Sequence, residues 1–189
     1  MKSFHIAIAT STLLVLVFIG CTTGRHAAPA HADEGTAKAQ EQIKPLVESL
    51  FLKTKALEAD YLDLRAVANV HAFLPDDLQL SHIQKAALYI QLALQKASSQ
   101  WELLSIMEDI KPTAVQDYYT LRHKGLRKAL DETGYDISFV KLYQTFITNA
   151  DAQKHITNAL GVIEEIDKIY VQLIEAVAPL VRKGLPTEV

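Results

Sequence analysis

Apolar residues recur at alternating steps of four and three along most of the chain after residue 36. The clearest run lies between residues 43 and 71. Its members are Ile43, Val47, Leu50, Thr54, Leu57, Tyr61, Leu64, Ala68 and His71. Similar runs occupy residues 83–104 and 156–180. This spacing places the apolar side chains on one face of an α-helix and leaves charged residues on the other faces. The pattern therefore predicts long amphipathic helices.

Three prolines bound the first two predicted helices. A proline is tolerated in a first turn, so Pro45 predicts a regular helix that begins near Lys44, with residues 36–43 forming a preceding turn or a kinked extension. Pro75 biases the residue before it away from helical geometry, and this separates the first helix from the second. We expect Pro112 to stop the second helix.

Two further helices are predicted in the second half of the chain. The third covers roughly residues 113–132, and Gly134 follows it as an expected C-cap. The fourth covers residues 137–182 and is rich in aromatic side chains over residues 137–147. The polar residues 149–151 are a candidate interruption within it.

Composition supports one helical domain. The chain has 189 residues, of which 49% are hydrophobic and 22% charged, and this is ordinary globular usage. Seven glycines and six prolines supply too few turns for an all-β sandwich or barrel. Four amphipathic helices with short connections favour an all-α, up-down four-helix bundle over residues 36–183, followed by a C-terminal tail of residues 184–189.

Charge and cysteine content exclude several classes of function. The formal net charge is −3, and because residues 1–20 hold one lysine and no acid, the remainder carries −4. A nucleic-acid-binding protein would need a clustered basic surface, so nucleic acid is not an expected partner. The single cysteine, Cys21, excludes an intrachain disulfide, Cys-x-x-Cys redox motifs and cysteine-rich metal sites.

The first twenty residues are typical of an export signal. Lys2 supplies a positive charge, an apolar run covers residues 6–19, and Gly20 precedes Cys21. The apolar run is shorter than the roughly 20 residues that a membrane-spanning helix needs. Residues 22–35 have little apolar bulk and no periodicity, so they are expected to form a flexible tether.

The sequence Phe18-Ile19-Gly20-Cys21 resembles the lipobox of bacterial lipoproteins. This resemblance implies that the Cys21 thiol is alkylated with diacylglycerol, that residues 1–20 are removed, and that fatty acids such as palmitate anchor the chain. Phe18 departs from the leucine that is usual at its position. Thr22 stands where lipoproteins of the inner membrane often have aspartate, so the resemblance favours the periplasmic face of the outer membrane. An ordinary secretory signal and a retained membrane anchor are the alternatives.

One candidate partner patch lies in the third predicted helix. Tyr118, Tyr119, Arg122 and His123 are close in sequence, and tyrosine and arginine are favoured at the centres of protein interfaces. The alternative is a solvated helix side with half-buried tyrosines.

Metal and cofactor chemistry is not predicted, since nucleotide-binding, metalloprotease and Glu-x-x-His motifs are absent. Asp151 and His155 are four residues apart and provide at most a weak pair of metal ligands, or else Asp151 simply lies near a helix start. His71 lies at the end of an apolar run and is a weaker candidate for a haem ligand than for a half-exposed histidine.

The sequence favours a non-enzymatic, lipid-anchored cell-envelope lipoprotein whose helical bundle binds another envelope protein or supports an assembly. The sequence does not distinguish a monomer from a homodimer, because heptad seams also form between copies. The alternative is a small-molecule or cofactor carrier with a pocket lined by Trp101, Tyr61 and Tyr170, although aromatic residues on a seam are more often core. An enzyme is disfavoured because no spacing brings acid–base groups together.

Overall fold

The computed structural model describes residues 34–72, 79–107, 110 and 114–181. These residues form four α-helices and one short 3₁₀ turn, with no strand among them. The elements are α1 (Glu34–His71), α2 (Leu80–Ser105), α3 (Val115–Gln144), α4 (Ala150–Val177) and η3 (Ala178–Leu180). The predictions for the export signal, Cys21 and most of the tether lie outside the described residues.

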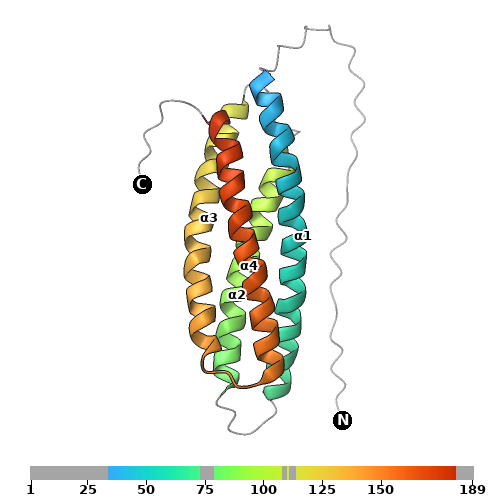
Figure 1. Ribbon diagram of the computed structural model, residues 1–189, viewed down its shortest axis with the longest axis vertical. Helices are drawn as coiled ribbons and strands as arrows, with labels where there is room; N and C mark the ends of the chain where they lie inside the picture. Colours follow the sequence, from blue (N-terminus) through green and yellow to red (C-terminus); the bar gives the residue numbers. More distant parts are fainter. Residues whose placement is uncertain (1–33, 73–78, 108–109, 111–113, 182–189) are drawn as a thin grey trace, which may run out of the picture. The chain divides into compact units, whose positions relative to one another are not determined.

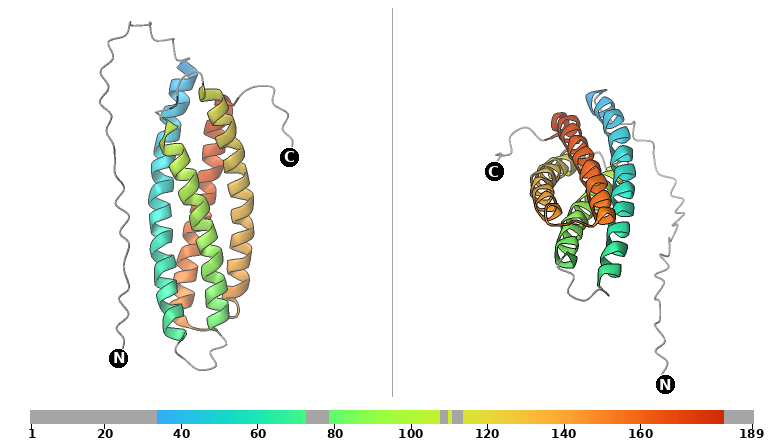
Figure 2. Two further views of the ribbon diagram at one scale, coloured as in Figure 1. Left: turned by 180° about the vertical axis from the view of Figure 1, so that it is seen from behind. Right: turned by 60° about the horizontal axis from the view of Figure 1, so that its bottom comes forward.

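The four helices form an up-down bundle, as the sequence pattern predicted (Figure 1). Each helix packs against two neighbours, so α1 and α3 both contact α2 and α4. A smaller diagonal contact joins α2 to α4. α1 begins at one end of the bundle, whereas α3 ends and α4 begins at the opposite end (Figures 1 and 2). At 1.5 Å per residue, the 38-residue α1 is about 57 Å long.

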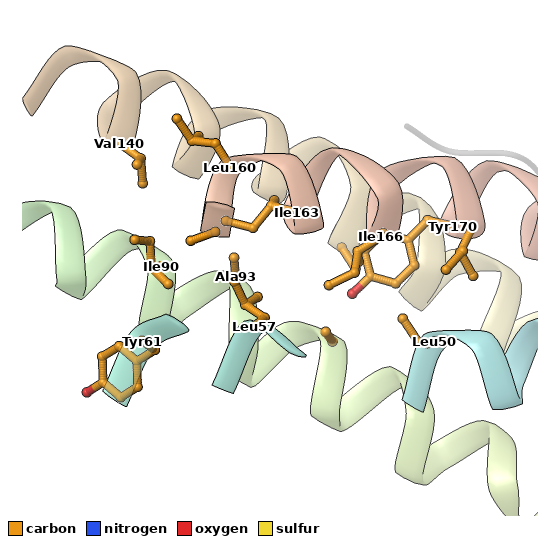
Figure 3. Close-up of a cluster of buried hydrophobic side chains, with 14 of the residues drawn as sticks. Leu50, Leu57, Tyr61, Ile90, Ala93, Val140, Leu160, Ile163, Ile166 and Tyr170 are labelled. Atoms are coloured by element: carbon orange, nitrogen blue, oxygen red, sulfur yellow. The ribbon is translucent and has the colours of Figure 1, made fainter. Parts of the chain in front are cut away.

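The core contains the apolar seams that the spacing identified. Every apolar member of the predicted run from Ile43 to Ala68 is buried. The predicted run from Ile156 to Leu180 is buried as well. Figure 3 shows side chains of all four helices meeting there, among them Leu57, Ile90, Val140 and Ile163. Burying such a side chain stabilises the fold by roughly 1.5–3 kcal/mol.

Residues 36–43 form part of the first helix, so the expected alternative of a turn before Lys44 is wrong. α1 already begins at Glu34 and continues through Pro45. A proline within a helix costs about 3 kcal/mol, because it removes one backbone hydrogen bond and crowds the preceding turn. The turns before Pro45 nevertheless pack into the core, where Ala39 is 6% exposed and Ile43 is fully buried. This burial offsets the local cost of the proline.

The expected end of the third helix at Gly134 is also wrong. α3 passes through Gly134 and ends at Gln144. Gly134 does not adopt the left-handed backbone conformation of a glycine C-cap. The buried face of α3 continues across it at steps of three and four. The members of that face are Leu126, Ala129, Thr133, Asp136 and Val140. The seam therefore continues past the glycine, but polar side chains at two of its positions conceal it.

The candidate interruption at residues 149–151 is the true boundary between α3 and α4. Asn149 has an extended backbone, with φ −66° and ψ 121°, and its side chain accepts a hydrogen bond from the Ala152 backbone N–H at 2.8 Å. This is an N-cap, which satisfies one of the free donors at the helix start. The fourth helix accordingly begins at Ala150 rather than near residue 137.

α2 ends before the position that Pro112 predicted. Its last helical residue is Ser105, whose hydroxyl donates to the Glu102 carbonyl at 2.8 Å. The Tyr118 hydroxyl of α3 donates to the Leu103 carbonyl. These two side chains take up carbonyl groups that the ending helix leaves free.

Candidate functional site

The structure does not form the predicted patch of Tyr118, Tyr119, Arg122 and His123 as an exposed surface. Tyr119 is 1% exposed, and its hydroxyl accepts a hydrogen bond from the Gln40 amide of α1 at 3.4 Å. Tyr118 is half-buried and bonded to the α2 backbone through its hydroxyl. Tyr119 therefore belongs to the core and cannot contribute its ring to a surface in this conformation.

The electrostatics of this segment agree with its burial. Desolvation raises the pKa of Tyr118 to about 12, although the Arg122 charge opposes the shift. Desolvation also raises the pKa of Tyr119 and lowers the pKa of His123, and the charge of Arg127 lowers the latter further. The Arg122 guanidinium lies 5.7 Å from the Tyr118 ring centre. The two neutral tyrosines thus join α3 to α1 and α2, and the cation–π contact between Arg122 and Tyr118 lies within α3.

The aromatic residues of the proposed carrier pocket are separated. Tyr170 is fully buried in the core, and Figure 3 shows its ring close to Ile166. Tyr61 lines an open groove of about 400 Å³ between α1 and α2. Trp101 lines a second groove of about 320 Å³ with Phe51 and Met107, and its ring centre lies 4.8 Å from that of Phe51. The three aromatic side chains therefore do not form one pocket.

The candidate metal ligands meet other partners. Asp151 lies in the first turn of α4, where the helix dipole favours an acid. His155 faces α1, and its Nδ1 lies 3.7 Å from both Asp60 Oδ1 and Asp63 Oδ2. His71 Nε2 lies 2.9 Å from the Asn149 side-chain nitrogen. Within the described residues, no group of three or more His, Cys, Asp or Glu side chains is placed to hold a metal ion.

A buried polar cluster joins α2, α3 and α4. Lys96 Nζ lies 2.5 Å from Asp136 Oδ2, and Asp136 is only 4% exposed. Asp167 of α4 interacts electrostatically with Asp136, and its buried Oδ1 has no hydrogen-bond partner among the described residues. Burial, then the neighbouring acids Glu164 and Asp136, raise the pKa of Asp167 to about 6. The packing of α2, α3 and α4 in this cluster therefore depends on the protonation state of Asp167.

A group of exposed apolar side chains follows the last part of α3, and we call it the α3 ridge. Its members are Tyr135, Phe139, Leu142 and Phe146. Their exposed fractions are 70%, 39%, 47% and 53%. The spacing of four and three places Tyr135, Phe139 and Leu142 on one side of α3, next to its buried face. Phe146 lies in the turn after α3, two residues beyond Gln144.

Side chains of α2 hold Phe139 and Phe146 of the ridge in place. Tyr89 stacks on Phe139 with ring centres 4.6 Å apart and an interplanar angle of 12°. His82 stacks on Phe146 at 5.0 Å and 25°. Tyr143 lies between them, 6.0 Å from Tyr89, with the Lys85 ammonium 5.4 Å from its ring centre. α2 and α3 lie side by side along this face of the bundle (Figure 2, left).

An exposed stripe of this kind differs from scattered apolar residues, which are normal on a protein surface. The remaining large exposed apolar side chains of the described residues are spread over the molecule. They are Leu52, Leu62, Val70, Leu88, Ile106, Leu121 and Val171. The α3 ridge is therefore the strongest candidate for an interaction surface in the described part of the chain.

Sequence reasoning recognised the aromatic enrichment of residues 137–147 but assigned it to the fourth helix. The available signal was the second seam, offset from the buried one, which Tyr135, Phe139, Leu142 and Phe146 form directly after the expected helix end at Gly134. Tyr135 fell between the expected third helix, which ended before Gly134, and the expected fourth helix, which began at residue 137, so it was not placed on one helix with the other three residues.

None of the described helices combines the length and the apolar character needed to cross a membrane. No protein-family model, curated protein or solved structure matches the chain. The functional conclusion therefore depends on the residues themselves.

Proposed function

We propose that the chain is a lipid-anchored lipoprotein of the bacterial cell envelope, and that its helical bundle is a non-enzymatic interaction module which binds through the α3 ridge. The observation that carries the binding role is the exposed group of Tyr135, Phe139, Leu142 and Phe146, two of which stack on rings of α2. The sequence Phe18-Ile19-Gly20-Cys21 supports the anchor, and the resemblance favours the periplasmic face of the outer membrane.

The physical state of the ridge supports binding. Large apolar side chains kept in water forgo roughly 25 cal/mol of stabilisation for each Å² left unburied, so a partner that covers them gains this energy. Aromatic rings also lose little conformational entropy on binding, because they have only two side-chain torsions. Stacking against Tyr89 and His82 restricts Phe139 and Phe146 further before any partner arrives.

The position of the ridge suits an anchored protein. Residues 1–33 join the bundle at the start of α1, whereas the ridge covers the last part of α3 at the opposite end of the bundle (Figure 1). The length of α1, about 57 Å, separates the two ends. The ridge therefore lies at the end of the bundle opposite to the start of α1, the helix to which the proposed anchor segment is joined.

Metabolic labelling with an alkyne fatty acid tests the anchor. We expect label on the full-length protein and none on the Cys21→Ala variant, because the thiol is the attachment point. Circular dichroism of both proteins is the control, and both spectra should be strongly helical. Equal labelling of the two proteins would refute lipidation at Cys21.

Photo-crosslinking in intact cells tests the binding surface. A photoreactive amino acid replaces Leu142 of the ridge, which is 47% exposed, or Leu62 on α1, which is 54% exposed and serves as the matched control. We expect a discrete protein adduct from position 142 and none from position 62. Indistinguishable adduct patterns at both positions would remove the ridge as the binding surface.

A further inference from the structure

A groove between α1 and α2 is built into the core seams of both helices, and we call it the α1–α2 groove. Ala68 of α1 and Ala87 of α2 line its deep part, where they are 7% and 6% exposed. Each of these side chains is a single methyl group, so the pair leaves space that larger apolar side chains fill elsewhere on the two seams. The space measures about 400 Å³, within the range of about 300–1,000 Å³ that is usual for small-molecule sites.

Amide groups line the α1–α2 groove on both helices. They belong to Asn69 of α1 and to Gln84 and Gln91 of α2. Each amide offers N–H donors and a carbonyl acceptor. Among the described residues, none of the three amides has a hydrogen-bond partner. A ligand with several hydroxyl groups matches such a lining, because a hydroxyl group both donates and accepts.

Arg65 supplies the charge of the α1–α2 groove. It is the one charged side chain among the described residues that line the groove, and no ion pair joins it to a described acid. Its guanidinium lies 5.8 Å from the ring centre of Tyr61, which also lines the groove. Tyr61 is 9% exposed, and Figure 3 shows its hydroxyl directed away from Leu57 and Ile90 of the core. The buried ring thus restricts the exposed arginine by a cation–π contact at the wall of the groove.

The charge of the groove selects the ligand. A guanidinium donates two parallel hydrogen bonds to a carboxylate, and the single positive charge of Arg65 matches a single negative charge. A phosphate monoester carries nearly two negative charges at neutral pH, and one arginine leaves part of that charge unpaired. A cationic ligand would meet the charge of Arg65 and no acid among the described lining residues. The lining therefore favours a monocarboxylate that also carries hydroxyl groups.

We propose that the α1–α2 groove binds a small hydroxylated carboxylate of the sugar-acid class. Arg65 binds the carboxylate, and Asn69, Gln84 and Gln91 bind the hydroxyl groups. Because the groove is open to solvent, we expect a dissociation constant of about 1 mM. This site goes beyond the proposed interaction module, since it lies on α1 and α2 and depends neither on the α3 ridge nor on the lipid anchor.

A nuclear magnetic resonance titration of the isotope-labelled full chain tests the site. The probes are sodium glucuronate and glucose, which share ring hydroxyl groups and differ in the carboxylate. We expect glucuronate to shift the side-chain amide signals of Asn69, Gln84 and Gln91 saturably, and glucose to bind at least about tenfold more weakly. The absence of a saturable shift up to about 50 mM glucuronate, or equal binding of glucose, would overturn the proposal.

Two arginine variants locate the carboxylate. Arg65→Gln removes the charge of the groove and should weaken glucuronate binding at least about tenfold, towards the affinity for glucose. The matched control is Arg127→Gln, which makes the same change of net charge at an exposed position of α3 and should leave binding unchanged. Both arginines are exposed, so thermal unfolding followed by circular dichroism should show two intact bundles. An equal loss of binding in both variants would reduce the effect to net charge and contradict the site.

Acetate tests the contribution of the amides, because it has the carboxylate and no hydroxyl group. We expect acetate to bind at least about fivefold more weakly than glucuronate, and Gln91→Leu to narrow this difference. Equal binding of acetate and glucuronate to the parent protein would overturn the assignment to sugar acids. These titrations are independent of fatty-acid labelling at Cys21 and of the photo-adduct at position 142, so failure of the groove and failure of the proposed function are distinguishable.

Discussion

Asp167 on α4 holds a carboxyl group in surroundings that oppose its ionisation. Burial is the largest cause, and the neighbouring acids Glu164 and Asp136 add to it, so the pKa rises from 3.8 to about 6. The folded protein therefore binds this proton more tightly than the unfolded chain does. Linkage then requires the free energy of unfolding to be larger at acidic pH and to fall as pH rises through about 6.

The Asp167→Asn variant tests this linkage. The amide has the shape of the protonated acid and cannot ionise, so the variant should lose part of the decline in stability between about pH 4 and pH 7. We expect the parent to lose about 1–3 kcal/mol over this range through Asp167, and the variant to be the more stable protein above pH 7. Urea unfolding at a series of pH values measures both. Parallel pH profiles for parent and variant would contradict the expectation.

Lys96 offsets part of the cost of burying Asp136. Desolvation raises the pKa of this acid, and the lysine 2.5 Å away opposes that shift. Removing one partner of a buried ion pair leaves an uncompensated charge, which typically costs about 3–5 kcal/mol. Because Lys96 is 20% exposed, we expect Lys96→Met to lower the free energy of unfolding by about 2–3 kcal/mol at neutral pH.

The control for Lys96→Met is the double variant Lys96→Met/Asp136→Leu. It replaces both charges with apolar groups and should regain most of the loss, since buried pairs are often replaceable by well-packed apolar side chains. Urea unfolding of the parent, both single variants and the double variant completes the cycle. If the change in the free energy of unfolding of the double variant equals the sum of the two single changes, the two side chains do not stabilise each other.

Pattern reasoning could not locate these groups, because it assigns apolar residues to the core and charged residues to the surface. Asp136 has the helical register of a core position and the chemistry of a surface one. Its lysine partner lies 40 residues earlier, on a different helix. Only the packing of α2 against α3 brings the two side chains together, so the burial of Asp136 depends on tertiary structure.

At the scale of the helix, replacing glycines tests whether α3 continues through Gly134. Gly134 and Gly161 lie inside helices, and a Cβ added at either would meet nothing within 4 Å. Alanine has the higher helix propensity, so we expect Gly134→Ala and Gly161→Ala each to stabilise the monomeric bundle by about 0.5–1 kcal/mol. If Gly134 ended the helix as a C-cap, the alanine would instead be destabilising. Thermal unfolding measures the sign.

Gly125 is the matched contrast for these two glycines. A Cβ at this position would approach the Gln100 side-chain oxygen at 3.3 Å, so the glutamine of α2 must shift to accept it. We expect Gly125→Ala to stabilise the bundle less than Gly134→Ala, although both positions lie in α3. An equal gain at the two positions would mean that α2 yields freely at this contact.

The sequence predicted helices well where the seam was purely apolar and poorly where it was mixed. The runs of α1 and α4 are almost continuous in Ile, Leu, Val and Ala, and their core faces were identified correctly. In α3, Thr133 and Asp136 interrupt the apolar seam on either side of Gly134, so the glycine looked like an end. The prediction gave more weight to the glycine as a helix-end signal than to the periodicity of the seam. In the protein, the packing of the seam keeps α3 helical through Gly134.

At the scale of the whole molecule, the all-α bundle follows from the sequence, but its outer surface does not. Two of the four members of the candidate patch, Tyr118 and Tyr119, turned towards neighbouring helices through bonds to Leu103 and Gln40. The α3 ridge was hidden because its residues were assigned to the wrong helix. Which side of a helix faces water depends on the positions of its neighbours, and the periodicity of one helix does not contain that information.

Two leucines on α3 separate the fold from its interaction surface. Leu126 is fully buried, whereas Leu142 in the ridge is 47% exposed. We expect Leu126→Ala to cost about 2–5 kcal/mol of stability through the cavity it leaves. Leu142→Ala should change the stability of the monomer by about 0.5 kcal/mol or less, because it removes little buried area. In cells the order reverses for association, with a photoreactive amino acid at Tyr135, 70% exposed, reporting contact with the ridge. Leu142→Ala should abolish the crosslinks from position 135, and Leu126→Ala should retain them in whatever protein still folds. Urea unfolding and crosslinking of the same two variants give both readouts. A large loss of monomer stability from Leu142→Ala would make the ridge part of the core packing rather than a surface kept free for a partner.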